Sequence, residues 1–269
     1  MDAIRITAVQ TDIVWEDPIA NFEGLDIKLK GLKGETDLIV LPEMFSTGFS
    51  MNPIKHAEIH PGPALKWMQS KAIELEAALC GSVMVSDEGK YYNRLYFVFP
   101  DGSSQQYDKR HLFSLAGEHD HFTAGRERLI VDYQGWRICP LICFDLRFPV
   151  WSRNHDVYDL LIYVASWPEA RIYAWRQLLI ARAIENQTYV VGVNRIGDDG
   201  TPLHYNGSTC VIDSLGAIYN EISNKDELVQ TTLLKSNLEK MKQKLPFLAE
   251  SDYFALDLDR RSFSGRLIS

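Results

Sequence analysis

The sequence predicts an α/β protein in which mixed β-sheets and helices form a layered sandwich. In both halves of the chain, short apolar runs typical of strands alternate with stretches whose apolar residues recur at helical spacing. Pairs of β-rich runs joined by turn residues lie between them and indicate antiparallel hairpins. This combination favours mixed sheets over an all-parallel dinucleotide-binding sheet, and neither GxGxxG nor GxxxxGK[ST] occurs. The 269 residues suit one large domain, 1–269, without repeats or a linker.

The first half of the chain supplies strands that alternate with two helices. Asp17 followed by Pro18 is a typical helix start, and Gly34 supplies the stop. A second helix is predicted from Pro63 to Leu79, because its apolar residues fall on one face. Strands are expected over 4–10, 37–41, 81–85, 91–99 and 104–107, and a polar loop follows over 109–125.

The second half repeats the alternation. Residues 166–169, Ser-Trp-Pro-Glu, resemble a capping box and predict a helix that starts there and runs to about Gln187. A short helix is expected over 237–244, and the tail, 245–269, has no clear period. Strands are expected over 129–133, 136–142, 159–166, 188–194, 209–213, 217–222 and 228–233.

Composition excludes several classes of function. There are 28 basic and 36 acidic residues, a net charge of −8, and no basic stretch that would bind nucleic acid. No apolar run approaches the roughly 18 residues that span a bilayer, and no signal sequence is evident, so we expect no membrane association and a cytoplasmic location. The four cysteines have neither a disulfide framework's spacing nor a zinc pattern, so no metal is expected.

Three predicted strands end on residues that can carry chemistry. Glu43 follows 37–41, Lys109 follows 104–107, and Cys143 follows the apolar run 138–142. Each taken alone is more simply explained as a structural ion pair, a solvated side chain or a core cysteine. If the strands are neighbours, however, the three tips meet at one sheet edge, where α/β proteins bind ligands.

The contexts of these residues resemble the nitrilase superfamily of carbon–nitrogen hydrolases. Glu43 in LPEMFSTGF, Lys109 in YDKRHLF and Cys143 in LICFDLRFP resemble its Glu-Lys-Cys triad. Three further blocks resemble the family in the expected order: ARAIENQ (181–187), VNRIG (193–197) and NGSTCVIDSLG (206–216). The resemblance implies an αββα sandwich that associates as a homodimer, with the tail 245–269 crossing to the partner, and that needs no cofactor.

The resemblance also assigns roles that agree with the chemistry of each residue type. A thiol with an ordinary pKa is mostly protonated at neutral pH, so Cys143 needs a base, which is Glu43. Lys109 and the backbone N–H of Phe144 would stabilise the oxyanion formed on attack. The family also has a second glutamate, in the loop after the lysine, that helps to orient the amine. Glu118 matches this position, and Asp120 and Glu127 are the alternatives. Without such a role, Glu118 would be an ordinary solvated acid of the loop.

The segment SWPEARIYAW (166–175) is most similar to the omega-amidase branch, which implies a small 2-oxo acid monoamide, 2-oxoglutaramate or 2-oxosuccinamate, as substrate. A distal carboxylate needs a cation, and Arg171 and Arg147 are candidates, although Arg147 could also pair with Asp145. Aromatic candidates for the pocket wall are Phe45, Trp167 and Tyr173. The alternatives are an aliphatic amide, a nitrile or an N-carbamoyl amino acid as substrate, or a ligand-binding protein without catalysis.

Overall fold

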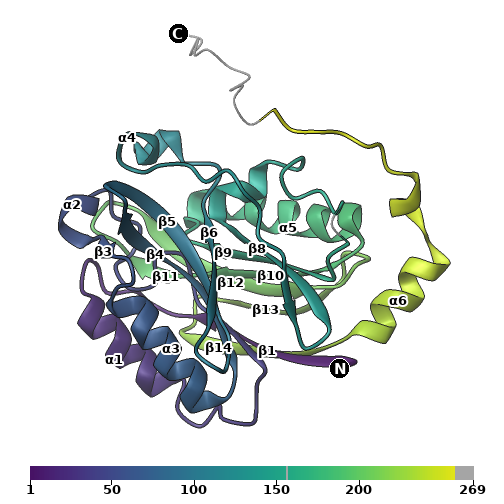
Figure 1. Ribbon diagram of the computed structural model, residues 1–269, viewed down its shortest axis with the longest axis horizontal. Coiled ribbons are helices and arrows are strands. Elements are labelled where there is room, and N and C mark those ends of the chain that lie inside the picture. The colour runs from purple at the N-terminus through teal and green to yellow at the C-terminus, as the bar shows by residue number, and fades with distance from the viewer. Residues whose placement is uncertain (156, 258–269) are drawn as a thin grey trace.

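Two seven-stranded sheets pack face to face with helices on both outer sides, in a computed structural model that describes residues 1–155 and 157–257 (Figure 1). Helices α1 and α3 lie on one outer side, and α5 lies on the other. The layers are therefore α, β, β and α, and the predicted fold class is confirmed.

The first sheet has the order β14-β1-β2-β4-β5-β6, with β3 paired to β4. Strands β1, β2 and β4 are parallel to one another, whereas β14, β5 and β6 are joined to their neighbours by antiparallel pairing. Its strands are β1 (Ala3–Gln10), β2 (Leu38–Val40), β3 (Glu58–Ile59), β4 (Ala78–Asp87), β5 (Lys90–Val98), β6 (Ser104–Asp108) and β14 (Glu227–Leu234).

The second sheet has the order β11-β12-β10-β9-β8-β7, with β13 paired to β12. Strands β8, β9 and β10 are parallel, and their residues are almost all buried, as expected for strands covered on both faces. Its strands are β7 (Val131–Tyr133), β8 (Trp136–Ile142), β9 (Leu160–Ala165), β10 (Tyr189–Asn194), β11 (Ile196–Asp198), β12 (His204–Ile212) and β13 (Ile218–Ser223).

The helices present their apolar faces to the sheets. Residues of α1 (Pro18–Lys28) and α3 (Pro63–Leu75) pack on the outer face of the first sheet, and α5 (Ile172–Asn186) packs on β10 and β12 of the second. Two four-residue helices, α2 (Pro53–His56) and α4 (Glu118–His121), lie in loops, and α6 (Lys235–Lys244) precedes the tail.

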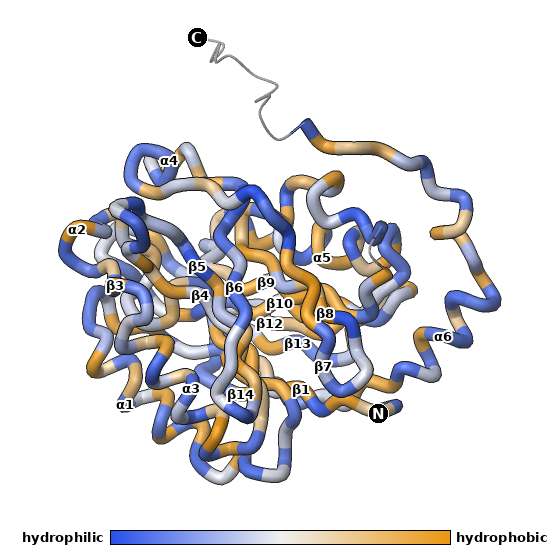
Figure 2. Tube along the Cα trace, viewed as in Figure 1, coloured by the Kyte–Doolittle hydropathy of each residue, from blue (hydrophilic) through white to orange (hydrophobic). Residues whose placement is uncertain are grey.

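Alternate residues of the strands fill the space between the sheets. On β5, Leu95 and Phe97 face the second sheet, whereas Tyr96 and Val98 pack under the helices of the first. Figure 2 shows the apolar strands at the centre of the molecule and the hydrophilic segments on the loops and outer helix faces. Because the space between the sheets is filled by buried apolar side chains, any polar side chain there requires a partner.

Three predicted helix boundaries are wrong by several residues. Helix α1 ends at Lys28, well before Gly34, which was predicted to stop it. The helix that begins at Pro63 ends at Leu75, because Glu76 adopts a left-handed conformation and the chain turns into β4, which contains Leu79. The capping box at Ser166 does not form: α5 begins at Ile172, and the Ser166 hydroxyl donates to the Glu43 carbonyl instead. The short elements α2, β3, α4 and β11 were not predicted.

Of the tail, residues 245–257 are described, and the remainder, 258–269, lies outside the described residues. Gln187 donates to the carbonyl of Leu245, and Phe254 packs against His155 at a ring distance of 4.5 Å. This part of the tail therefore contacts its own chain. Within the described ranges, no helix combines the length and the apolar character that crossing a bilayer requires.

Candidate active site

The three predicted strand ends meet between the two sheets. Glu43 follows β2 and Lys109 follows β6, both in the first sheet, whereas Cys143 follows β8 in the second. The three strands are therefore not neighbours, which was the condition for a shared sheet edge: facing sheets bring the tips together, and two strands, β4 and β5, lie between β2 and β6.

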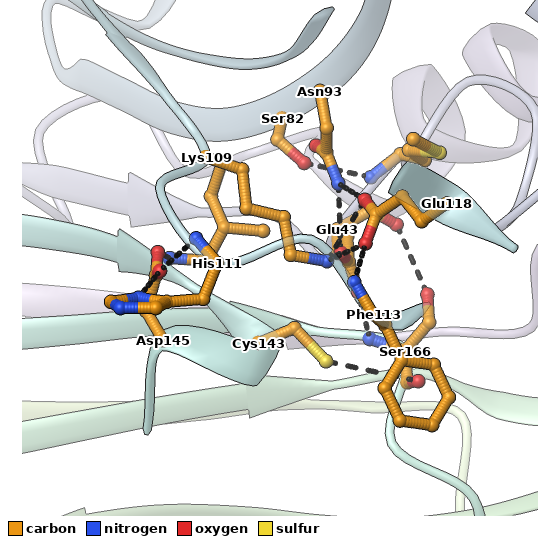
Figure 3. Close-up of polar contacts among 12 residues, drawn as sticks. Glu43, Ser82, Asn93, Lys109, His111, Phe113, Glu118, Cys143, Asp145 and Ser166 are labelled. Carbon is orange, nitrogen blue, oxygen red and sulfur yellow. Dashed lines mark hydrogen bonds and ion pairs between the residues drawn. The ribbon is translucent and has the colours of Figure 1, made fainter. Parts of the chain in front are cut away.

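Lys109 is the centre of a buried charge cluster (Figure 3). Its ammonium lies 2.8 Å from Glu43 Oε1 and 2.9 Å from Glu118 Oε2, and all three side chains are fully buried. Burial alone would lower the pKa of Lys109, but the carboxylates of Glu118 and Glu43 reverse this effect and raise its pKa above the ordinary value. The two carboxylates therefore keep Lys109 in its charged form and hold its ammonium in place between them.

Glu118 belongs to this cluster, whereas its alternatives do not. The backbone N–H of Phe113 donates to Glu118 Oε2 at 2.6 Å, and Lys109 contacts both carboxylate oxygens. Burial raises the pKa of Glu118, and the charge of Lys109 opposes that rise. Asp120 and Glu127 are exposed to solvent.

Cys143 stands at the tip of β8 in an unusual backbone conformation. Its φ of 41° lies in the left-handed region, which a non-glycine residue adopts only when its surroundings hold it there. Cys143 is the first residue of a 3-10 helix, Cys143–Arg147, and as a whole residue it is partly exposed. Burial raises the pKa of the Cys143 thiol well above its ordinary value, Glu43 raises it further, and Lys109 opposes both.

A third buried carboxylate, Asp145, holds this turn against the Lys109 loop. Its Oδ2 accepts from the hydroxyl of Tyr107 at 2.7 Å and from the backbone N–H of Ile142 at 3.1 Å. Its Oδ1 accepts from the backbone N–H of His111 at 3.0 Å and lies 2.8 Å from His111 Nδ1. Asp145 therefore connects residues on either side of Lys109 to the residue before Cys143.

A cavity of about 480 Å³ opens over the thiol. Cys143 and Lys109 line it, as do three of the predicted substrate-binding residues, Phe144, Trp167 and Arg171. Phe45 does not: it is buried among Phe22 and Trp67 under the first sheet, so its prediction as a pocket wall is wrong. Tyr173 is likewise absent from the lining and is 77% exposed.

Two arginines in the cavity wall lack acidic partners. The guanidinium of Arg147 lies 4.9 Å from the Trp167 ring, and that of Arg171 lies 5.1 Å from the Phe113 ring. In the part of the chain that the structure describes, neither forms an ion pair, and Asp145 pairs with His111 and Tyr107 and not with Arg147. No cluster of three potential metal-ligating side chains occurs in 1–155 or 157–257.

Sequence reasoning missed Asn93 and Ser166. Asn93 Nδ2 lies 2.9 Å from Glu43 Oε1 and 3.2 Å from Glu118 Oε1, and the backbone N–H of Ser166 donates to Glu43 Oε2 at 2.8 Å. A signal for Asn93 was available, because it shares its strand face with Leu95 and Phe97 and is therefore a polar residue at an inward position. Ser166 acts through its main chain, which no side-chain pattern reveals.

Comparison with known proteins agrees with this geometry. The family model described as carbon–nitrogen hydrolase matches residues 5–243. Omega-amidase YafV of Escherichia coli (strain K12) is 44% identical over 95% of this chain and 100% of its own length, and 2-oxoglutaramate amidase of Bacillus subtilis (strain 168) is 30% identical over 90% and 95%. The solved structure of a CN-hydrolase superfamily protein from Xanthomonas campestris, with an arsenic adduct in its active site, is 45% identical, covers 95% of this chain and 100% of its own, and has a TM-score of 0.93. The chain belongs to the carbon–nitrogen hydrolase family.

Proposed function

We propose that the protein is an omega-amidase that hydrolyses the terminal amide of a small 2-oxo dicarboxylic acid monoamide, 2-oxoglutaramate or 2-oxosuccinamate. The observation that carries this proposal is the composition of the cavity, in which a thiol, a buried lysine and two arginines without an ion pair among the described residues line one space of about 480 Å³. The names of the relatives, omega-amidase and 2-oxoglutaramate amidase, support the same substrate class.

In the proposed reaction, the thiol proton of Cys143 moves to the Glu43 carboxylate as sulfur attacks the amide carbon. The oxygen of the tetrahedral intermediate takes negative charge, which Lys109 and the backbone N–H of Phe144 stabilise. Glu43 then returns the proton to the leaving nitrogen, so ammonia departs and a thioester remains. A water molecule, deprotonated by the same carboxylate, hydrolyses the thioester and restores the thiol. Glu118 keeps Lys109 in place throughout.

The two arginines account for the second carboxylate of the substrate. A guanidinium that lines a cavity without an acidic partner is available for a bidentate pair with a carboxylate. Asp199 is the one acidic residue in the described lining, and it accepts hydrogen bonds from the hydroxyl of Tyr205 and the backbone N–H of Thr201. Lys109, Arg147 and Arg171 outnumber this carboxylate, so the charge of the lining is positive, which favours an anionic amide over a neutral one.

Ammonia release from a panel of substrates tests this proposal. The panel contains 2-oxoglutaramate, 2-oxosuccinamate, glutamine, an uncharged aliphatic amide, a nitrile and an N-carbamoyl amino acid, and Cys143→Ala serves as the blank. We expect the two 2-oxo acid amides to have the highest kcat/KM. Turnover of the nitrile or the carbamoyl compound without turnover of any amide would assign the protein to another branch. An absence of turnover together with an unreactive Cys143 would support a ligand-binding role.

Substitution of the arginines tests how the carboxylate is held. Arg171→Met and Arg147→Met should each lower kcat/KM for 2-oxoglutaramate by about 10- to 100-fold, the usual effect of losing a charge-assisted hydrogen bond. The uncharged amide should be affected far less. Arg176→Met is the matched control, because Arg176 is on α5 but pairs with Glu221 outside the cavity. Equal loss on charged and uncharged amides would contradict a carboxylate-binding role.

We also propose that 1–269 acts as one domain and forms a homodimer in the cytoplasm, with part of the tail 245–269 reaching the partner. The four free cysteines agree with a reducing compartment. Sedimentation of the full chain against a chain ending at residue 244 tests the assembly. We expect a dimer for the full chain and weaker association for the shortened one, and a monomeric full chain would exclude the dimer.

A further inference from the structure

Asn93 bridges the two buried acids of the cluster. It lies on β5 on the face that points between the sheets, and its side chain is fully buried. Its single side-chain nitrogen lies within hydrogen-bonding distance of both Glu43 Oε1, at 2.9 Å, and Glu118 Oε1, at 3.2 Å (Figure 3). One amide therefore connects the two carboxylates that also share Lys109.

The other half of the same amide has no partner. Asn93 Oδ1 is buried and accepts no hydrogen bond within the described ranges. A buried carbonyl without a donor costs free energy, so the asparagine does not satisfy its own hydrogen-bonding capacity at this position. What it does supply is two N–H donors directed at two acids.

The two oxygens of Glu43 are consequently unequal. Oε1 accepts from Lys109 Nζ at 2.8 Å and from Asn93 Nδ2 at 2.9 Å, which occupies both of its lone pairs. Among the residues that the structure describes, Oε2 accepts only from the backbone N–H of Ser166, at 2.8 Å. The carbonyl of the same Ser166 lies 4.0 Å from Cys143 Sγ. Oε2, which has a lone pair left to accept a proton, is therefore the Glu43 oxygen that contacts the residue next to the thiol.

We infer that Asn93 is a positioning residue for the reaction, which together with Lys109 occupies Oε1 of Glu43 and so makes Oε2 the atom that exchanges the proton. In the first step the S–H bond of Cys143 breaks, an O–H bond forms at Oε2, and sulfur bonds to the amide carbon. The proton later leaves Oε2 for the departing nitrogen. This inference rests on the proposed amidase function, because it concerns the base of that reaction.

Two variants of Asn93 separate its donor role from simple packing. Asn93→Ala removes the donor that, with Lys109, occupies Oε1 of Glu43, so kcat should fall about tenfold and the acidic limb of the pH profile of kcat/KM should move to higher pH. Asn93→Asp keeps the shape but replaces the N–H donors by a third acid beside Glu43 and Glu118. It should therefore be less active at neutral pH than Asn93→Ala, whereas a packing role would predict the reverse order.

Ser82→Ala is the matched structural control. The Ser82 hydroxyl is buried on the neighbouring strand β4 and accepts from the backbone N–H of Met44, so its loss removes a hydrogen bond beside Glu43 without removing a donor to either acid. Its acidic limb should coincide with that of the unmodified protein. Where Asn93→Ala does not fold, Asn93→Ser retains one hydroxyl donor and should show a smaller shift in the same direction.

The measurement is ammonia release from the amide that the unmodified protein hydrolyses best, with active sites counted by alkylation of Cys143, so that misfolded molecules do not enter kcat. An unshifted acidic limb in Asn93→Ala or Asn93→Ser, or an Asn93→Asp variant as active as the unmodified protein, would overturn the inference. Failure of the unmodified protein to hydrolyse any amide would instead overturn the proposed function.

Discussion

Cys143 differs from the reactive cysteines that exist as thiolates in the resting enzyme. In an ion pair with a histidine or at a helix N-terminus, the thiol pKa falls below its ordinary value. Here burial and the Glu43 carboxylate raise it, and Lys109 opposes this only in part. In the proposed reaction, the nucleophile therefore rests as a neutral thiol and loses its proton to Glu43 only as it attacks.

The ultraviolet absorbance of the thiolate tests the resting state of Cys143. In the difference spectrum between the unmodified protein and Cys143→Ala, we expect no thiolate signal from neutral pH up to about pH 8.5, the ordinary pKa of cysteine. The other three cysteines are buried and cancel in the difference. A thiolate signal at neutral pH would contradict the proton transfer to Glu43 during attack.

Lys109→Ala should cost both activity and stability. Loss of an oxyanion donor lowers kcat by about 100- to 1000-fold, and removal of one member of a buried ion pair destabilises a protein by about 3–5 kcal/mol. Denaturant unfolding measures the second effect. Lys33→Ala is the control, because Lys33 and its partner Glu76 are both more than half exposed and should change stability by less than about 1 kcal/mol.

The destabilisation by Lys109→Ala should also depend on pH. The pKa of Glu118 is already raised by burial, and it rises further without the cation. A carboxyl group whose pKa is raised by folding favours the folded state below its unfolded pKa of about 4.3, and this contribution is lost as pH rises through the folded pKa. The loss of stability should therefore be larger at pH 8 than at pH 5, and a pH-independent loss would show that the acids are not left ionised and unpaired.

At the level of the elements, α5 packs closely on β10 because Gly192 of that strand has no side chain. A Cβ at Gly192 of β10 would lie 2.5 Å from Leu179 Cδ1 and 2.9 Å from Trp175 Cζ2, both on α5. The helix therefore packs directly on the backbone of the strand. Because Arg171 immediately precedes α5, this packing also determines where its guanidinium enters the cavity.

Two glycine substitutions should have opposite effects on the free energy of unfolding. Gly192→Ala should lower it by about 1–3 kcal/mol, since Trp175 and Leu179, which the added Cβ would contact, are both fully buried. Gly24→Ala, on the exposed face of α1 with nothing within 4 Å of the added Cβ, should raise it by up to about 1 kcal/mol. Urea unfolding of both variants is the measurement, and a neutral Gly192→Ala would mean that α5 can shift at no cost.

At the level of the whole molecule, the site exists only while the two sheets keep their spacing. Glu43 and Lys109 belong to one sheet and Cys143 to the other, and Asp145 connects the two through Tyr107, His111 and Ile142. Since Cys143 also holds a left-handed backbone conformation, its position depends on the contacts around it.

Asp145→Asn should weaken the hydrogen bonds that connect the two sheets at the site. An amide replaces one accepting oxygen by a donor, which leaves at least one of the N–H or O–H groups around it unpaired. We expect a loss of a few kcal/mol in the free energy of unfolding and at least a tenfold fall in kcat. Asp132→Asn is the control, because the Asp132 side chain is 81% exposed on β7. Unchanged kcat in Asp145→Asn would contradict a role in holding the nucleophile.

Local sequence patterns were sufficient to predict the fold class, the order of nearly all strands and the three strand ends that carry Glu43, Lys109 and Cys143. These depend on local periodicity, turn residues and short motifs, which are properties of neighbouring residues in the chain. The predicted start of a helix at Ser166 was wrong because it depends on a contact that is distant in the chain. The Ser166 hydroxyl donates to the carbonyl of Glu43, 123 residues away, and does not cap a helix.

No local pattern indicates which sheet carries each residue, or that Asn93, Ser166 and Asp145 belong to the site; both became visible in the folded protein. The tertiary structure also moved Phe45 into the core and kept Arg147 and Arg171 in the cavity. The physical reason is that burial and ion pairing depend on what faces a side chain across the space between two sheets. Two side chains of the same type, such as Glu118 and Glu127 in one loop, therefore become a buried lysine partner and a solvated acid.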